Sequence, residues 1–227
     1  MSIEKEKLFG YNNVVCIFLR VVKGETVKIL NFKKVLCLVF TFSLGAALLC
    51  GCGQDKNRKT KISIDKNGGV VNTIYEEFTQ DYYDVSELSD MASEEISYYN
   101  SEYVSPKISL TEVTKLEEEP YVRLKMTFES ASDYSHFNQT SLFFGTVAEA
   151  VEKGYELSAA LVNNEGQKID LGSNDFHEKH IVITTEKTII ETPYAIEYMS
   201  DGVFLKDKKE ADLTNVLTDS VQLLLSK

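Results

Sequence analysis

Cysteine is scarce in this 227-residue chain, and all four cysteines lie within the first 52 residues. No residue after Cys52 carries a thiol, so this long remainder can form no disulfide and offers no cysteine nucleophile. Tryptophan is missing altogether, which removes the strongest platform for stacking on sugars and leaves twelve tyrosines for that task. A chain of about 165 residues can bury enough apolar surface to fold without cross-links. We therefore expect an ordinary hydrophobic core after Cys52.

Basic residues are also in short supply beyond Cys52. Residues 1–51 contain seven of the 24 basic residues and only three of the 35 acidic ones, so removing this segment would leave a net charge of −15. Such a chain repels nucleic acid, whose binding depends on Lys and Arg at phosphates, and nucleic acid is excluded as a partner. Residues 52–60 are the exception: they form a basic linker that either lies on lipid headgroups or serves as a flexible solvated spacer.

A hydrophobic run long enough to span a membrane is lacking as well. The longest run, Val35 to Leu49, has about fifteen residues, whereas a spanning helix needs about 20. Lysines precede the run, as in a secretory signal peptide, and the other interpretation is a buried core helix. We expect a signal peptide over 27–51. Residues 1–26 are then an extension, which arises either because translation starts at Val27 or because the extension is genuine.

The run ends in the sequence LLCGCG at residues 48–53. If Cys52 is the first residue after cleavage, Leu49 stands at −3 and Gly51 at −1, and this stretch resembles the lipobox of bacterial lipoproteins. The resemblance implies that signal peptidase recognises Leu49 and Gly51. It also implies that the Cys52 thiol receives a diacylglyceryl group, so that membrane lipid is the first partner. The chain would then be held on the outer face of the cytoplasmic membrane.

The first half of the remainder alternates strands with one helix. Residues 61–65 and 70–78 predict a hairpin, with Asn67 and Gly68 in a type I′ turn. Residues 107–113 and 121–129 alternate with period two and predict two further strands with one buried face. Between these pairs, apolar residues recur every three or four positions from Val85 to Tyr99, which predicts an amphipathic helix capped by Asp84.

The second half predicts short strands with short helices starting near Ser130 and Thr146. Turns at residues 164–166 and 201–202 are expected to join neighbouring strands as hairpins, and residues 188–199 read as one strand. Runs of strands with segregated helices indicate an α+β fold. We expect a mainly antiparallel sheet, one amphipathic helix and short capping helices, in a single domain over 61–227.

Catalytic and metal-binding patterns are sparse. The three histidines include His177 and His180, which are spaced by three with carboxylates beside them and are weak candidates for a metal site without a third ligand. No G-x-S-x-G sequence is present, and the S-x-x-K sequence at Ser63 falls in a strand rather than at a helix start. The sequence therefore predicts no catalytic residues and no cofactor.

The segments TIYEEFTQDYYDVSEL, FFGTVAEAVEKGYEL and VITTEKTIIETPYAIEYMSDGV resemble uncharacterised lipoproteins of Gram-positive, clostridia-type bacteria. This resemblance implies a location in the cell and a fold, and it implies no reaction. We expect a binding or interaction module that takes an unknown surface ligand or protein. The alternatives are a cell-surface hydrolase that uses dispersed carboxylates and the ligand-capturing partner of a transporter.

Overall fold

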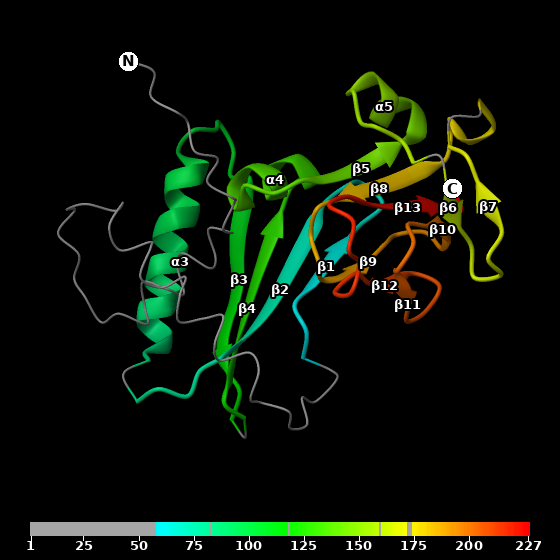
Figure 1. The fold of residues 1–227 in the computed structure, drawn as a ribbon. Helices are drawn as coiled ribbons and strands as arrows, with labels where there is room; N and C mark the ends of the chain where they lie inside the picture. Colours follow the sequence, from blue (N-terminus) through cyan, green and yellow to red (C-terminus); the bar gives the residue numbers. More distant parts are fainter. Residues whose placement is uncertain (1–57, 82, 118, 159, 172–173) are drawn as a thin grey trace, which may run out of the picture.

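The computed structural model describes residues 58–81, 83–117, 119–158, 160–171 and 174–227, so the predicted signal peptide and Cys52 lie outside the described residues. Its strands and helices follow one another along the chain as Figure 1 shows. The first half contains β1 (Lys61–Ile64), β2 (Val70–Glu77), α3 (Val85–Asn100), β3 (Ile108–Lys115), β4 (Tyr121–Phe128) and α4 (Ala131–Asn138). The second half contains β5 (Leu142–Thr146), α5 (Val147–Glu152), β6 (Leu161–Val162), β7 (Lys168–Ile169), η1 (Asn174–Phe176), β8 (His180–Thr184), β9 (Ile189–Glu191), β10 (Ile196–Met199), β11 (Phe204–Leu205), β12 (Glu210–Asp212) and β13 (Val221–Leu225).

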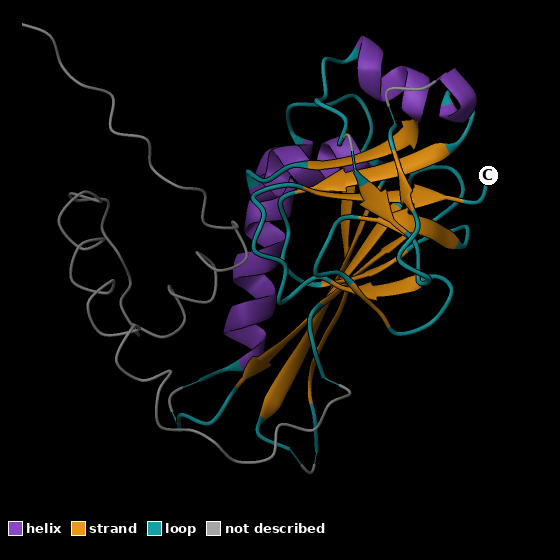
Figure 2. Cartoon of the chain, turned by 45° about the vertical axis from the view of Figure 1, so that its right-hand side comes forward, coloured by secondary structure: helices purple, strands orange, loops and turns teal. Residues whose placement is uncertain are grey.

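The strands form two sheets rather than one. Sheet A has the order β11-β12-β9-β1-β2-β4-β3, and sheet B has the order β5-β8-β13-β10-β6-β7. Within the described ranges, the pair β1 and β9 is parallel and the other pairs are antiparallel. Mostly antiparallel strands with few helices are consistent with an α+β or a mainly-β fold. Figure 2 shows the strands of the two sheets crossing near the middle of the molecule.

Sheet A has one buried and one solvent-facing side. In β4 the buried residues are Val122, Leu124, Met126 and Phe128, and the residues between them are partly exposed. This confirms the alternation predicted for residues 121–129. We call the buried side the inner face and the other side the outer face.

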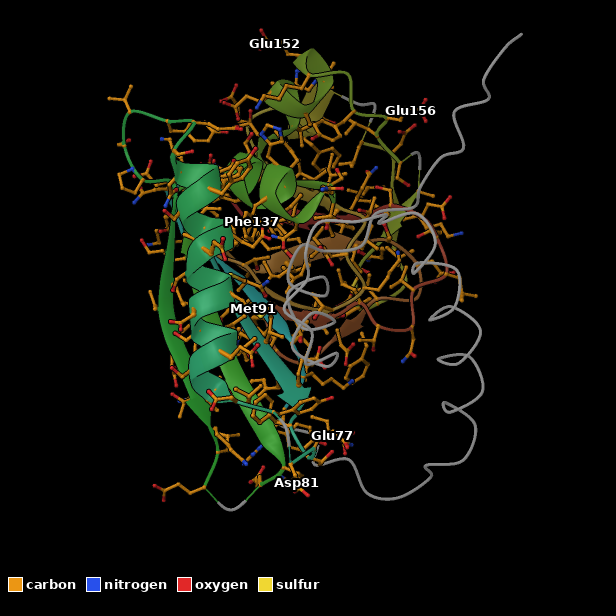
Figure 3. All side chains as sticks on the ribbon, turned by 90° about the vertical axis from the view of Figure 1, so that its left-hand side faces the viewer. Glu77, Asp81, Met91, Phe137, Glu152 and Glu156 are labelled. Carbon is orange, nitrogen blue, oxygen red and sulfur yellow. The ribbon has the colours of Figure 1, made fainter. Side chains whose placement is uncertain are left out.

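Helix α3 packs against the inner face beside β3, as Figure 1 shows. It begins because the Asp84 side chain accepts hydrogen bonds from the backbone N–H groups of Ser86 and Glu87. Leu88, Ala92 and Ile96 are its buried residues, one turn apart on the side that faces the sheet. Figure 3 shows Phe137 of α4 lying beside this helix.

The centre of sheet B is buried on both faces, and all five residues of its strand β13 are buried. Leu223 and Leu225 belong to the core that sheet B shares with sheet A and α3. Leu224 points the other way, into a second apolar cluster that includes Val147 and Ala150 of α5. The two sheets are therefore joined by one continuous core, with α5 covering the far side of sheet B.

Several local predictions differ from the structure. β1 and β2 do form the predicted hairpin, but the type I′ turn is wrong, because Gly68 has a positive φ of 86° and Asn67 does not. The hairpin predicted around residues 201–202 is also wrong: β10 belongs to sheet B, and β11 pairs with β12 in sheet A. The hairpin around residues 164–166 is confirmed by the pairing of β6 with β7.

Candidate functional site

A groove of about 570 Å³ lies on the outer face of sheet A, at the end where β1 turns into β2. Strands β1, β2 and β4 contribute its floor, and the segment that follows β9 contributes a wall. Ser63, Val71 and Thr127 come from the floor, and Pro193 from the wall. The lining therefore mixes hydroxyl groups with apolar side chains, as in a site that binds a ligand by contact and orients it through a few polar groups.

The tip of the β1–β2 hairpin forms one end of the groove. The Asp65 Oδ1 atom accepts hydrogen bonds from the backbone N–H of Asn67 at 2.7 Å and of Gly69 at 2.9 Å. A Cβ atom on Gly69 would lie 2.7 Å from the Asp65 carboxylate, so this close approach requires glycine. Asp65 is thus used to shape the loop, and the neighbouring Lys66 side chain has no ion-pair partner within the described part of the chain.

On one side of the groove, charged side chains of opposite sign are paired with one another. Ser63 Oγ donates to Glu191 Oε2 at 2.9 Å, and Lys61 Nζ lies 2.8 Å from Glu191 and 2.9 Å from Glu210. The hydrogen bond from Lys61 lowers the pKa of Glu191, and the hydrogen bonds from Lys206 and Lys61 lower the pKa of Glu210. Both carboxylates are therefore ionised at neutral pH and paired with lysine.

The wall that follows Glu191 is fixed by hydrogen bonds. Thr192 is buried, and its hydroxyl donates to the backbone oxygen of Tyr194 at 2.8 Å and of Lys209 at 3.1 Å. Lys209 Nζ donates in return to the Pro193 oxygen at 2.8 Å. These bonds hold the segment after β9 in place, so the groove is a preformed feature of the fold.

The two candidate metal residues are held in different ways: the backbone oxygen of His177 accepts from the N–H of Ala148, and His180 is packed by its ring. The His180 ring packs between Phe144 and Tyr194, with ring centroids 5.3 and 5.2 Å away. Its Nδ1 atom lies 2.8 Å from the backbone oxygen of Lys227, and because that oxygen can only accept, Nδ1 donates. Over the residues that the structure describes, no group of three or more His, Cys, Asp or Glu side chains could hold a metal ion.

Residues 52–60, predicted as a basic linker, are described from Arg58 onward. There Arg58 forms an ion pair with Glu119, and Lys59 Nζ lies 2.8 Å from the Asp212 carboxylate. Although burial by itself would raise it, the hydrogen bonds from Lys59 and Thr214 lower the pKa of Asp212 to about 2. The last part of the linker is therefore attached to sheet A at the end opposite the groove.

A buried polar pair was not anticipated from the sequence. Tyr134 is 1% exposed, and its hydroxyl donates to Glu186 Oε1 at 3.0 Å. Burial raises the pKa of Glu186, and burial together with the negative Glu186 raises the pKa of Tyr134. Glu186 follows β8, where nothing in the sequence distinguishes it from a surface glutamate. The partners of Glu186 are Tyr134 and Thr140, which suits a structural role.

No model of a protein family, no curated protein and no solved structure matches the chain.

Among the helices in the described ranges, none has the length and apolar character needed to cross a membrane.

Proposed function

We propose that the chain is a bacterial lipoprotein, anchored through acylated Cys52 to the outer face of the cytoplasmic membrane, whose domain binds a ligand at the cell surface. The lipobox pattern at Leu49, Gly51 and Cys52 supports the anchor. In this proposal, residues 61–227 form one domain of the kind found in uncharacterised lipoproteins of clostridia-type bacteria. Helix α3 is its one amphipathic helix, and α4 and α5 are short helices that cap the strands.

The position of the groove relative to the linker is the observation that carries the binding function. β1 begins at Lys61, directly after the linker, and ends at Ile64, where the groove starts. A domain tethered at the first end of β1 therefore presents the groove at the other end, away from the lipid. Lys66, Ser63 and Thr127 offer one cation and two hydroxyls to a ligand, beside the apolar surfaces of Val71 and Pro193.

The charge of the groove supports binding rather than hydrolysis by paired carboxylates. A glycosidase needs one carboxyl group with a raised pKa as the acid, beside an ionised one. Of the carboxyl groups that line the groove, Glu191 has a lowered pKa and is paired with Lys61, Glu129 is paired with Lys107, and Asp65 holds the hairpin loop. Burial raises the pKa of Glu76 and of Glu186, but neither residue lines the groove.

The anchor is tested by two cysteine variants that lie two positions apart at the lipobox. Cys52→Ser is expected to leave an uncleaved precursor, because the acylated thiol is the substrate of the processing step. Cys50→Ser is the matched control and is expected to be processed normally. Mass spectrometry of the mature amino terminus reads out both. A terminus at residue 50, or normal processing of Cys52→Ser, would contradict the anchor.

The groove is tested by a ligand screen that measures the melting temperature of the protein with wall peptides, wall glycan fragments and small solutes. Thr127→Arg places a long cation in the groove and is expected to abolish any stabilisation that a ligand gives. Thr114→Arg is the matched control, since Thr114 is exposed in β3 near the opposite end of sheet A. Equal ligand shifts in both variants would place the binding site elsewhere.

A further inference from the structure

Two large apolar side chains stand in solvent at the end of sheet A where the linker enters. Phe204 in β11 is 67% exposed, and Leu217 in the loop after β12 is 98% exposed. β11 pairs with β12 so that Phe204 lies opposite Asp212, and a Cβ atom on Gly202 would lie 3.7 Å from Val216. The strand that carries Phe204 and the loop that carries Leu217 therefore run side by side.

The linker contacts this same place. Asp212 is the cross-strand neighbour of Phe204, and its carboxylate lies 2.8 Å from Lys59 Nζ. Lys187 donates to the backbone oxygen of Thr218, the residue after Leu217. Two lysine ammonium groups thus flank the apolar pair. Lysines beside exposed apolar side chains are typical of surfaces that lie at a lipid headgroup region.

The chain length between Cys52 and Lys59 limits how far this surface can stand from the anchor. These residues are seven positions apart, so a fully extended chain between them spans no more than about 25 Å. A lipid held at Cys52 therefore keeps Lys59 within that distance of the headgroups, and Phe204 lies close to Lys59 because it is paired with Asp212. The other exposed large apolar residues do not share this connection. Val151 is in α5, which covers the far side of sheet B (Figure 1). Tyr98 and Val104 lie on either side of Asn100, which bonds to Ile108 at the groove end of sheet A.

The distribution of charge selects the same orientation. Helix α3 carries Glu87, Asp90, Glu94 and Glu95 and contains no lysine or arginine. An anionic lipid surface repels that side of the domain. Near Phe204, Lys59 pairs with Asp212 and Lys206 pairs with Glu210, so two of the acids there are neutralised. An anionic bilayer therefore repels the Phe204 edge less than it repels α3.

From these observations we infer that Phe204 and Leu217 form the surface by which the domain rests on the lipid bilayer, so that the groove faces outward. This inference rests on the proposed lipid anchor at Cys52. The two side chains enter the headgroup boundary and set the orientation, while the acyl chains provide the attachment. Sheet A then stands on the membrane by its linker end.

The absence of tryptophan allows a direct test. Phe204→Trp, Leu217→Trp and Val151→Trp each introduce one fluorophore at an exposed position. The full chain is produced in a bacterium that processes lipoproteins, and is placed in vesicles of phosphatidylcholine and phosphatidylglycerol with or without bromine in the acyl chains. We expect vesicles to shift the emission of the first two variants to the blue, and brominated lipid to quench it. Val151→Trp should show neither effect.

The possible results separate the membrane-facing surface from the lipid anchor. Mass spectrometry and flotation first establish whether the protein carries lipid on Cys52 and stays with the vesicles. A floating, acylated protein in which Phe204→Trp and Leu217→Trp remain unquenched overturns the inference and leaves the anchor standing. A protein without acyl groups overturns both. A blue shift that grows with protein concentration in the absence of vesicles would assign the surface to a second copy of the chain instead. Leu217 lies in an exposed loop, so its variant remains informative if Phe204→Trp fails to fold.

Discussion

Removing the Tyr134 hydroxyl should destabilise the protein in a way that depends on pH. The ring of Tyr134 is fully buried and stays in place in Tyr134→Phe, so the change deletes one hydrogen bond and opens no large cavity. The deleted bond runs to the carboxylate of Glu186 at 3.0 Å, and a bond to a charged group contributes about 1.5–3 kcal/mol. We expect the free energy of unfolding at pH 8 to fall by that amount.

The pH dependence follows from the direction of the pKa shift. Burial raises the pKa of Glu186 above its ordinary value of 4.5, so the folded state holds this proton more tightly than the unfolded state. The contribution of Glu186 to stability is therefore complete below pH 4.5 and declines as pH rises through the folded pKa. The Tyr134 hydrogen bond opposes the rise, so its loss raises the pKa of Glu186 further and makes the decline larger.

The measurement is urea unfolding followed by far-ultraviolet circular dichroism, on a chain that starts at Gly53. The loss caused by Tyr134→Phe should be larger at pH 8 than at pH 4, and much smaller when Glu186→Gln is already present. Tyr155→Phe is the control, because that ring packs on Phe143 with a centroid distance of 4.8 Å and is only half-buried. An equal loss at both pH values, or an unchanged loss in the presence of Glu186→Gln, would refute the assignment.

Four further predictions concern the core, the hairpin turn, the linker ion pair and the absence of cysteine. Phe128→Ala should lower the free energy of unfolding by about 3–5 kcal/mol in the same urea assay, because the side chain is 1% exposed and packs on Tyr134 at 5.1 Å; a loss below about 1 kcal/mol would mean that the two sheets do not share this core. Gly68→Ala should lower the free energy of unfolding by about 1–2 kcal/mol in melting experiments, because φ at this position is 86°. There is room for the added Cβ atom, so the loss reports backbone strain alone. An unchanged stability would mean that the turn adopts another conformation. Asp212→Asn should lower the free energy of unfolding by only about 1 kcal/mol at pH 7, because Lys59 is 42% exposed and solvent screens the ion pair. The pKa of Asp212 is lowered to about 2, so its contribution to stability disappears as pH falls from about 4 to 2. A loss that does not depend on pH would contradict the ion pair. Residues 53–227 should melt at the same temperature with and without reductant, because they contain no cysteine.

The sequence predicted what local patterns can encode. The alternation in β4 and the capping residues Asp84, Ser130 and Thr146 are all observed, because each depends on residues within a few positions of one another. The prediction of one strand over residues 188–199 is wrong. Proline has no N–H to donate and interrupts the ladder at Pro193, so β9 and β10 lie in different sheets.

The groove could not be predicted because its two sides are far apart in the sequence. Ser63 and Glu191 are separated by 128 positions and meet through the parallel pairing of β1 with β9. Neither strand specifies a parallel partner at that separation, since β1 reads KISI and β9 reads IIE, and these short apolar patterns would suit many neighbours. Glu186 was missed for a related reason: its burial is created by Tyr134, 52 positions earlier.

The central position of β1 in sheet A also determines how the protein would respond to force. β1 pairs with β2 on one side and with β9 on the other, and it connects the linker to the hairpin at the groove. Tension between a lipid at Cys52 and a ligand in the groove acts along β1, so the hydrogen bonds on both sides are loaded together in shear. A strand at the edge of the sheet would instead be peeled away one bond at a time. Under the proposed anchoring, the domain therefore resists unfolding when a bound ligand is pulled away from the membrane.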